Sequence, residues 1–233
     1  MDAATAEEYA GPQMAGFKDF YQFIAPTRVI AGRDLIGGIG FELSKEGVKR
    51  PLIVTDEVIH GTGLIDRVRA GVEDGGLEVA GVYDEVPPDS SSVVVTSCAE
   101  AAKEHGADAI LAVGGGSVMD TAKAADVVFT NGGEPRDWEG YFNLPRADDG
   151  LGRPLEIAPL ACIPTTAGTG SEVSFAAVIK DRENHIKFQI GDFPMYPRVA
   201  LLDPEATRTL PPQIAAATGM DAMTHAIEGY VSS

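Results

Sequence analysis

A short apolar segment that runs directly into three glycines constrains this chain more than any other feature. Residues 109–113 have the composition of a buried strand, Gly114, Gly115 and Gly116 follow at once, and residues 117–128 have the composition of a helix. Two further apolar segments, 51–55 and 159–163, also end in polar turns. Strands that alternate with helices of modest length predict an α/β fold with a doubly wound parallel sheet.

The remaining segments extend this pattern along the chain. We expect an extended pair at 21–24 and 28–31, helices at 34–46, 64–73 and 90–105, and a strand at 77–83. After residue 172 we expect a hairpin of 173–180 with 185–190, a strand at 199–202, and a long helix that opens at Pro211 and Pro212. In such folds the turns after the strands gather at the carboxyl edge of the sheet, where ligands bind.

The charge balance excludes several classes of function. With 18 Lys and Arg against 35 Asp and Glu, the chain has a formal charge of −17, so we expect no nucleic-acid and no membrane partner. No run approaches the roughly 18 apolar residues of a membrane span, and the N-terminus lacks the basic start of a signal peptide. Two cysteines are too few for a disulfide framework, so we expect the protein in the reducing cytoplasm.

The glycine turn has the chemistry of an anion site. Backbone without Cβ atoms can approach a pyrophosphate, and the free N–H groups at the start of the next helix favour its charge. The ordinary alternative is a tight turn between a strand and a helix. The GxGxxG spacing is absent, and so is the acidic residue expected about 20 residues later. Asp56, which follows an earlier strand, could bind a ribose or simply cap a helix.

Two further stretches contain groups that bind ligands. Residues 164–172 carry four hydroxyls and two glycines after a buried strand. They could contact a phosphate or a ribose, or they could only form a polar cap. Asp221 and His225 stand four apart on an expected helix, so they share a face and could hold a divalent metal. Most pairs at this spacing are solvated or form a simple ion pair.

Three stretches together resemble the iron-containing alcohol dehydrogenase family. They are GGGSVMD at 114–120, PTTAGTGSEVS at 164–174 and GMDAMTHAIEGYVS at 219–232. The resemblance implies a Rossmann-like α/β domain of the dehydroquinate synthase type, then the first helix of an all-helical domain, with a metal in the cleft between the domains. Family members transfer a hydride between alcohols or carbonyls and NAD or NADP.

The resemblance assigns cofactor contacts residue by residue. They are Gly114, Gly115, Gly116, Ser117, Val118 and Asp120 toward the pyrophosphate and nicotinamide, Thr165, Thr166 and Thr169 toward the adenosine and phosphate, and Val178 and Lys187. Lys187 would lie near the ribose hydroxyls, although a surface charge on a hairpin is its ordinary alternative. Asp56 stands where the family selects its cofactor, and an acid there favours NAD over NADP. Residues 86–90 depart from the family's Asn-Pro pair, which leaves one cofactor contact in doubt.

The resemblance also divides the chain and implies half a metal site. We expect a flexible tail at 1–20, a dinucleotide-binding domain at 21–205 and the start of a truncated helical domain at 206–233. Asp221 and His225 match two ligands of the family's metal, Fe²⁺ or alternatively Zn²⁺. The other two ligands, both histidines, would follow residue 233, since we expect the sequence to lack its C-terminal part.

The expected function is hydride transfer between NAD and a metal-bound alcohol, aldehyde or ketone. We expect the full-length enzyme to be a homo-oligomer. One alternative keeps the fold and changes the chemistry to that of glycerol dehydrogenases or dehydroquinate synthases. The other alternative is a nucleotide-binding module without turnover.

Overall fold

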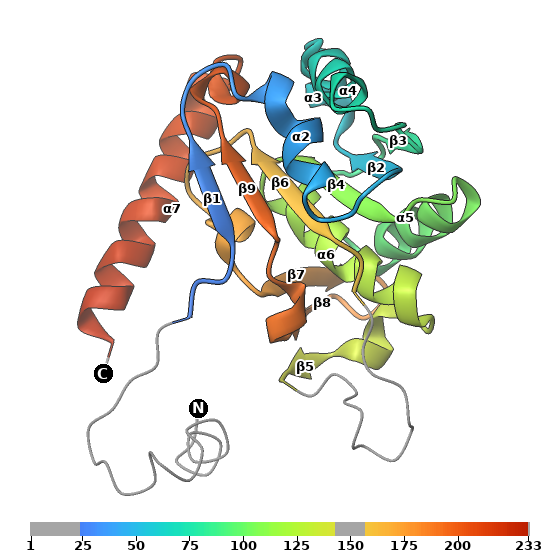
Figure 1. The fold of residues 1–233 in the computed structure, drawn as a ribbon. Helices are drawn as coiled ribbons and strands as arrows, with labels where there is room; N and C mark the ends of the chain where they lie inside the picture. The colour runs from blue at the N-terminus through green and yellow to red at the C-terminus, as the bar shows by residue number, and fades with distance from the viewer. Residues whose placement is uncertain (1–23, 143–156, 233) are drawn as a thin grey trace, which may run out of the picture.

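Six parallel strands form the central sheet of the computed structural model, which describes residues 24–142 and 157–232 (Figure 1). The strand order is β1–β9–β6–β4–β2–β3. Their bounds are β1 (Arg28–Ala31), β2 (Pro51–Val54), β3 (Gly81–Tyr83), β4 (Ala109–Gly114), β6 (Leu160–Pro164) and β9 (Val199–Leu202). Every residue of β2, β4 and β6 is buried, which explains why these strands are continuous apolar runs in the sequence.

Helices cover both faces of this sheet, so the fold is doubly wound as the sequence predicts. Alternate strand residues point to opposite faces. Leu52, Ile110 and Cys162 pack toward α5 (Ser92–Glu104) and α6 (Gly116–Asn131). Ile53 and Leu111 pack toward α2 (Ile39–Ser44) and α4 (Leu64–Asp74) on the other face.

Three further strands form a small second sheet beside α6, in the order β5–β8–β7. They are β5 (Gly140–Tyr141), β7 (Ala176–Asp181) and β8 (Ile186–Gly191). The antiparallel pairing of β7 with β8 confirms the predicted hairpin. Its turn is closed by Asp181, whose carboxylate accepts hydrogen bonds from the backbone N–H groups of Glu183 and Asn184.

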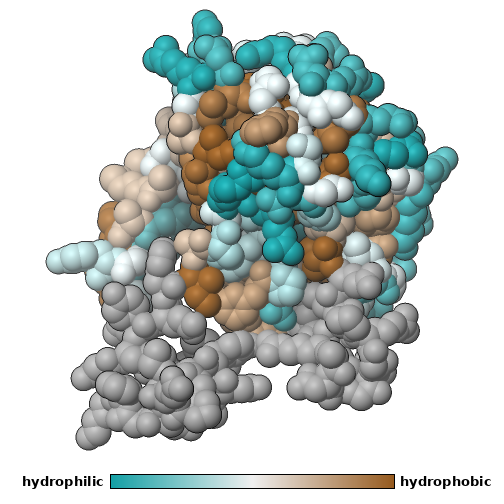
Figure 2. Space-filling model, in the orientation of Figure 1, coloured by the Kyte–Doolittle hydropathy of each residue, from teal (hydrophilic) through white to brown (hydrophobic). Residues whose placement is uncertain are grey.

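The last helix, α7 (Pro212–Val231), runs along one side of the domain. Its side chains are not buried against the described residues, and several large apolar ones are exposed. Figure 2 shows apolar residues at the left-hand edge, where α7 lies. Within the described ranges, no helix has the length and apolar character needed to cross a membrane.

Two predicted elements differ from the observed ones. The helix expected at 34–46 is split into a 3₁₀ turn, Ile36–Gly38, and α2. The carboxylate of Asp203 accepts hydrogen bonds from the N–H groups of Leu35 and Ile36, and these bonds fix the backbone where the 3₁₀ turn begins. The strand expected at 77–83 is formed only at 81–83, since the N–H of Leu77 bonds back to the end of α4. The extended segment expected at 21–24 and the tail at 1–20 fall almost wholly outside the described residues.

Asp126 is an ionisable group placed in the core by α6, which is buried on most of its surface. Its Oδ1 accepts the N–H of Ala158 at 3.0 Å, whereas Oδ2 has no hydrogen-bond partner among the described residues. Burial raises the pKa of this carboxyl to about 8. An acid with a raised pKa takes up a proton on folding between its unfolded and folded pKa values, and stability then falls as pH rises through that window.

We predict that Asp126→Asn removes this pH dependence. In the parent chain, the free energy of unfolding should fall between about pH 4 and about pH 8, by up to ~1.4 kcal/mol per pH unit from this one group. Urea unfolding at several pH values measures the slope, and the Asn variant should lose that part of it. Glu100→Gln, on the exposed face of α5, is the control and should leave the slope unchanged. An equal slope in the parent and the Asp126 variant would contradict the prediction.

Candidate functional site

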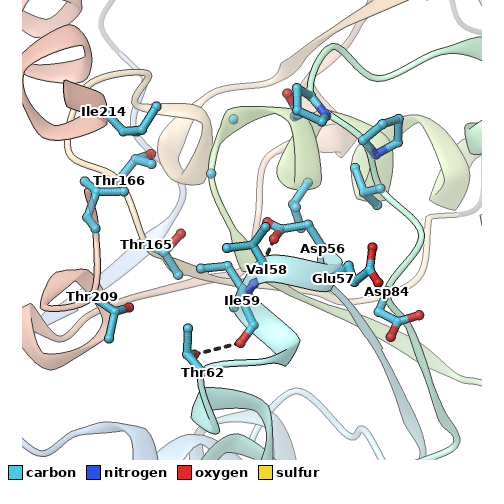
Figure 3. Close-up of a pocket in the computed structure, with 18 of the residues that line it drawn as sticks. Asp56, Glu57, Val58, Ile59, Thr62, Asp84, Thr165, Thr166, Thr209 and Ile214 are labelled. Carbon is cyan, nitrogen blue, oxygen red and sulfur yellow. Dashed lines mark hydrogen bonds between the residues drawn. The ribbon is translucent and has the colours of Figure 1, made fainter. Parts of the chain in front are cut away.

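The candidate site lies where the chain reverses its direction of winding across the sheet. Strands β2 and β4 are neighbours, but the chain leaves β2 toward β3 on one side and leaves β4 toward β6 on the other. Such a switch point opens a crevice beyond the carboxyl ends of the two strands. A cavity of about 930 Å³ is found there, lined by the segments that follow β2, β3, β4 and β6 and by the start of α7 (Figure 3).

The first glycine turn places the start of a helix at this cavity. Gly115 is the N-cap of α6 in an extended conformation, and no side chain caps the helix at that residue. Gly116, Ser117 and Val118, which form the first turn of α6, line the cavity. The first N–H groups of a helix have no partner within the helix and carry its positive dipole end. The turn therefore has the partial charge that an anion requires.

The second turn, Thr165–Ser171, is held against the first. The N–H of Thr165 donates to the carbonyl of Gly114 at 2.9 Å. A Cβ on Gly116 would lie 2.9 Å from Cγ2 of Thr169, and one on Gly115 would lie 3.2 Å from Cγ2 of Thr166. The glycines are needed here because the two turns touch at these positions. Thr165 and Thr166 line the cavity beside the amides of the first turn.

Asp56 caps a helix, which is one of the two roles that the sequence left open. Its Oδ1 accepts the N–H of Ile59 at 2.9 Å and so caps the short helix α3 (Glu57–His60). It also lines the cavity, together with Glu57, Asp84 and Glu85. These four carboxylates form an acidic wall, and the helix amides lie elsewhere on the cavity lining.

Five predicted cofactor residues do not line the cavity: Gly114, Asp120, Thr169, Val178 and Lys187. Gly114 and Thr169 contact lining residues, and Asp120 and Val178 contact each other. Gly114 bonds to Thr165, Thr169 touches the Cβ position of Gly116, and Asp120 accepts the N–H of Val178 at 3.0 Å. Lys187 is instead an exposed partner of Asp89, with Nζ 3.1 Å from Oδ1.

Asp221 and His225 share one face of α7, with Nε2 of the histidine 3.7 Å from Oδ1 of the aspartate. Both side chains are about half exposed, and neither lines the cavity. The helix carrying them touches the second turn, since a Cβ on Gly168 would lie 2.3 Å from the carbonyl oxygen of Thr218. Their donor chemistry fits a divalent metal, but over residues 24–142 and 157–232 no third His, Cys, Asp or Glu joins them. A protein metal site takes three or four ligands.

Sequence reasoning missed one residue of this region, Lys123 of α6. Its ammonium group is buried and bonds to Ser171, at the end of the second turn. A signal was present in the sequence: the lysine interrupts a run of alanines and other small residues in a helix with little polar surface.

Comparison with known proteins gives one consistent family. The family model described as iron-containing alcohol dehydrogenase matches residues 26–204. The NAD-dependent methanol dehydrogenase of Bacillus methanolicus is 39% identical over 210 residues, which cover 90% of this chain and 52% of the relative. The choline dehydrogenase of Bacillus subtilis is 39% identical over 220 residues, 94% of this chain and 52% of the relative. The chain thus spans about half the length of these relatives.

A solved structure agrees with the sequence matches. It is a sulfoacetaldehyde reductase from Bifidobacterium kashiwanohense in complex with NAD⁺, which superposes with a TM-score of 0.80 at 30% identity. The match covers 91% of this chain and 54% of that chain.

The contact between the two turns predicts a specific rescue. Gly116→Ala should lower the free energy of unfolding by about 1 kcal/mol or more, because the new methyl group meets Cγ2 of Thr169. Adding Thr169→Ser removes that carbon and keeps the hydroxyl, so the double variant should lose less than the sum of the single variants. Urea unfolding measures the coupling. Gly38→Ala, with open space around its Cβ position, is the control; additive losses would contradict the contact.

Proposed function

Since the chain belongs to the iron-containing alcohol dehydrogenase family, we propose that it binds NAD in the cavity at the switch point and forms the cofactor half of a dehydrogenase. The protein would transfer a hydride between the nicotinamide and the carbon of an alcohol, aldehyde or ketone. The observation that carries this proposal is that the first turn of α6, which has the free N–H groups of a helix start, lines a cavity of about 930 Å³. Cavities of roughly 300–1,000 Å³ are typical of small-molecule sites.

The residues present fit a dinucleotide. The pyrophosphate would lie against the amides of Gly116, Ser117 and Val118, where a Cβ or a bulky side chain at the turn would exclude it. The hydroxyls of Thr165 and Thr166 would donate to its oxygens. Gly115 lines the cavity beside them. Gly114, Asp120, Thr169 and Val178 complete the proposed cofactor site outside the lining. Lys187 would reach a ribose only by leaving Asp89.

Asp56 gives the cavity its proposed preference for NAD over NADP. A carboxylate beside an adenosine ribose accepts hydrogen bonds from its hydroxyls and repels a 2′-phosphate. Glu57, Asp84 and Glu85 add negative charge to the same wall.

Asp221 and His225 are the proposed metal ligands within this chain, for Fe²⁺ or Zn²⁺. A bound divalent metal would supply Lewis-acid polarisation of the alcohol oxygen. The contribution of the turns described above is orientation, because they fix the cofactor at one edge of the sheet.

Two further properties belong to the proposal. Cys98 and Cys162 are buried free thiols, which suits a reducing cytoplasm. A homo-oligomer is the assembly we propose for the whole enzyme.

Titration of the 233-residue chain with NADH, followed by cofactor fluorescence, tests the binding half of the proposal. The formation of NADH from NAD and a series of short alcohols, with Fe²⁺ or Zn²⁺ added, tests turnover. Saturable binding with turnover supports a dehydrogenase. Saturable binding without turnover supports a nucleotide-binding module, and the absence of binding contradicts the proposal.

The acidic wall predicts a change of cofactor preference. Asp56→Ser removes the negative charge, and serine is also a favourable residue at a helix N-cap. The ratio of NADPH to NADH affinity should rise about tenfold, since one unit charge at a few ångströms is worth on the order of 1–4 kcal/mol. Fluorescence titration with both cofactors measures the ratio. Glu100→Gln removes a charge far from the cavity as the control, and an unchanged ratio in the Asp56 variant would count against this role.

A further inference from the structure

We propose that Lys123 is a positioning residue that holds the second turn, Thr165–Ser171, in the place that NAD binding requires. This inference rests on the proposed cofactor site and adds to it a residue that does not touch the cavity. Lys123 lies on α6, the helix that the first glycine turn begins. It therefore connects the two turns from inside the protein.

The ammonium group of Lys123 has a complete set of partners. Its Nζ donates to Oγ of Ser171 at 2.9 Å, to Oγ of Ser174 at 3.0 Å and to the carbonyl of Ala176 at 3.0 Å. An ammonium has three N–H donors, so all three are used. The side chain is only 1% exposed. All three acceptors lie on the segment that leads from the second turn into β7.

Ser171 links this lysine to a carboxylate one helical turn away. Its hydroxyl accepts from Lys123 and donates to Oδ1 of Asp120 at 2.8 Å. The other oxygen of Asp120 accepts the N–H of Val178 at 3.0 Å. Asp120 and Lys123 thus hold residues 171–178 at both ends. The N–H of Ser171 also donates to Oγ1 of Thr169 at 3.2 Å. A fixed Ser171 therefore also restricts the position of Thr169 within the turn.

The energetics of buried charge favour a positioning role over a stabilising one. Removing a lysine and an aspartate from water costs free energy that their mutual attraction repays only in part. Burial lowers the pKa of Lys123 and raises the pKa of Asp120, as this cost requires. Apolar replacements of such networks often preserve stability. An apolar side chain at position 123 could not donate a hydrogen bond to Ser171 and so could not fix its position. The position of Ser171 matters because Thr166 and Thr169 of the same turn contact Gly115 and Gly116.

The decisive variant is Lys123→Met, which keeps an unbranched side chain of similar length without donors. We expect the dissociation constant for NADH to rise about tenfold, equivalent to about 1.4 kcal/mol. We also expect amide hydrogen exchange to increase in residues 165–174. Asp126→Asn is the matched control, because Asp126 is a buried ionisable residue three positions along the same helix and its partner is Ala158, before β6. It should change neither measurement.

A pH profile separates positioning from general loss of structure. The charged or titratable groups that face Lys123 are Asp120 on α6, Cys162 on β6 and Glu172 in the turn after Gly170. Burial raises the pKa of Cys162 to about 12, so that thiol stays protonated. A deprotonated Lys123 has two N–H donors for three acceptors. Because burial lowers the pKa of Lys123, the NADH affinity of the parent should fall with rising pH below the range in which a lysine ordinarily titrates, and Lys123→Met should lack this fall.

Ser171→Ala is the second variant, and it removes the link without touching the lysine. It should also weaken NADH binding and increase exchange in the second turn, even if the Lys123 variant does not fold. A parent chain that binds no NADH contradicts the proposed function and this inference with it. A parent that binds, with both variants binding equally well and exchanging equally slowly, contradicts the inference alone.

Discussion

The parallel pairing of β4 with β6 brings the two turns of the proposed cofactor site to one edge of the sheet. Gly114 pairs with Pro164 at the end of this ladder, and the N–H of Thr165 continues it by donating to the carbonyl of Gly114. The turns that follow β4 and β6 therefore cannot move apart. As a result, residues of the first turn of α6 and of the second turn line one cavity. Any side chain at Gly116 would push them apart. The proposed cofactor site depends on this backbone contact more than on any single polar group.

The electrostatics of the cavity are those of a small anion site in a strongly acidic protein. A chain with a net charge of −17 repels anions at a distance, so the attraction has to be local. In the proposed site the helix amides would supply it at the first turn, while Asp56, Glu57, Asp84 and Glu85 give another part of the cavity lining acidic side chains. A ligand with a pyrophosphate at one point and free hydroxyls at another matches both parts. A ligand with a second phosphate group near the wall does not.

Sequence patterns predicted the parts of the structure that depend on short-range signals. The buried strands, the glycine turn and the β7–β8 hairpin follow from apolar runs and turn residues. The broken helix near Gly37 was not predicted, because its entry is fixed by Asp203, which lies far away in the sequence. Lys123 was missed for the same reason, since its three acceptors are about 50 residues further along the chain. Motifs predicted which residues belong to the proposed site, but only the tertiary structure separates those that line the cavity from those that do not.

The strand order also determines when this domain can fold. Within residues 24–142 and 157–232, strand β1 pairs only with β9, so Arg28 finds its neighbour Val199 about 170 residues later. During translation at roughly 5–20 residues per second, the first strand waits on the order of 10 to 30 s for its partner. Contacts of such long range also slow refolding of the complete chain. Over that interval β1 is an unpaired edge, and its short length of four residues limits how well it can pair with a neighbouring nascent chain.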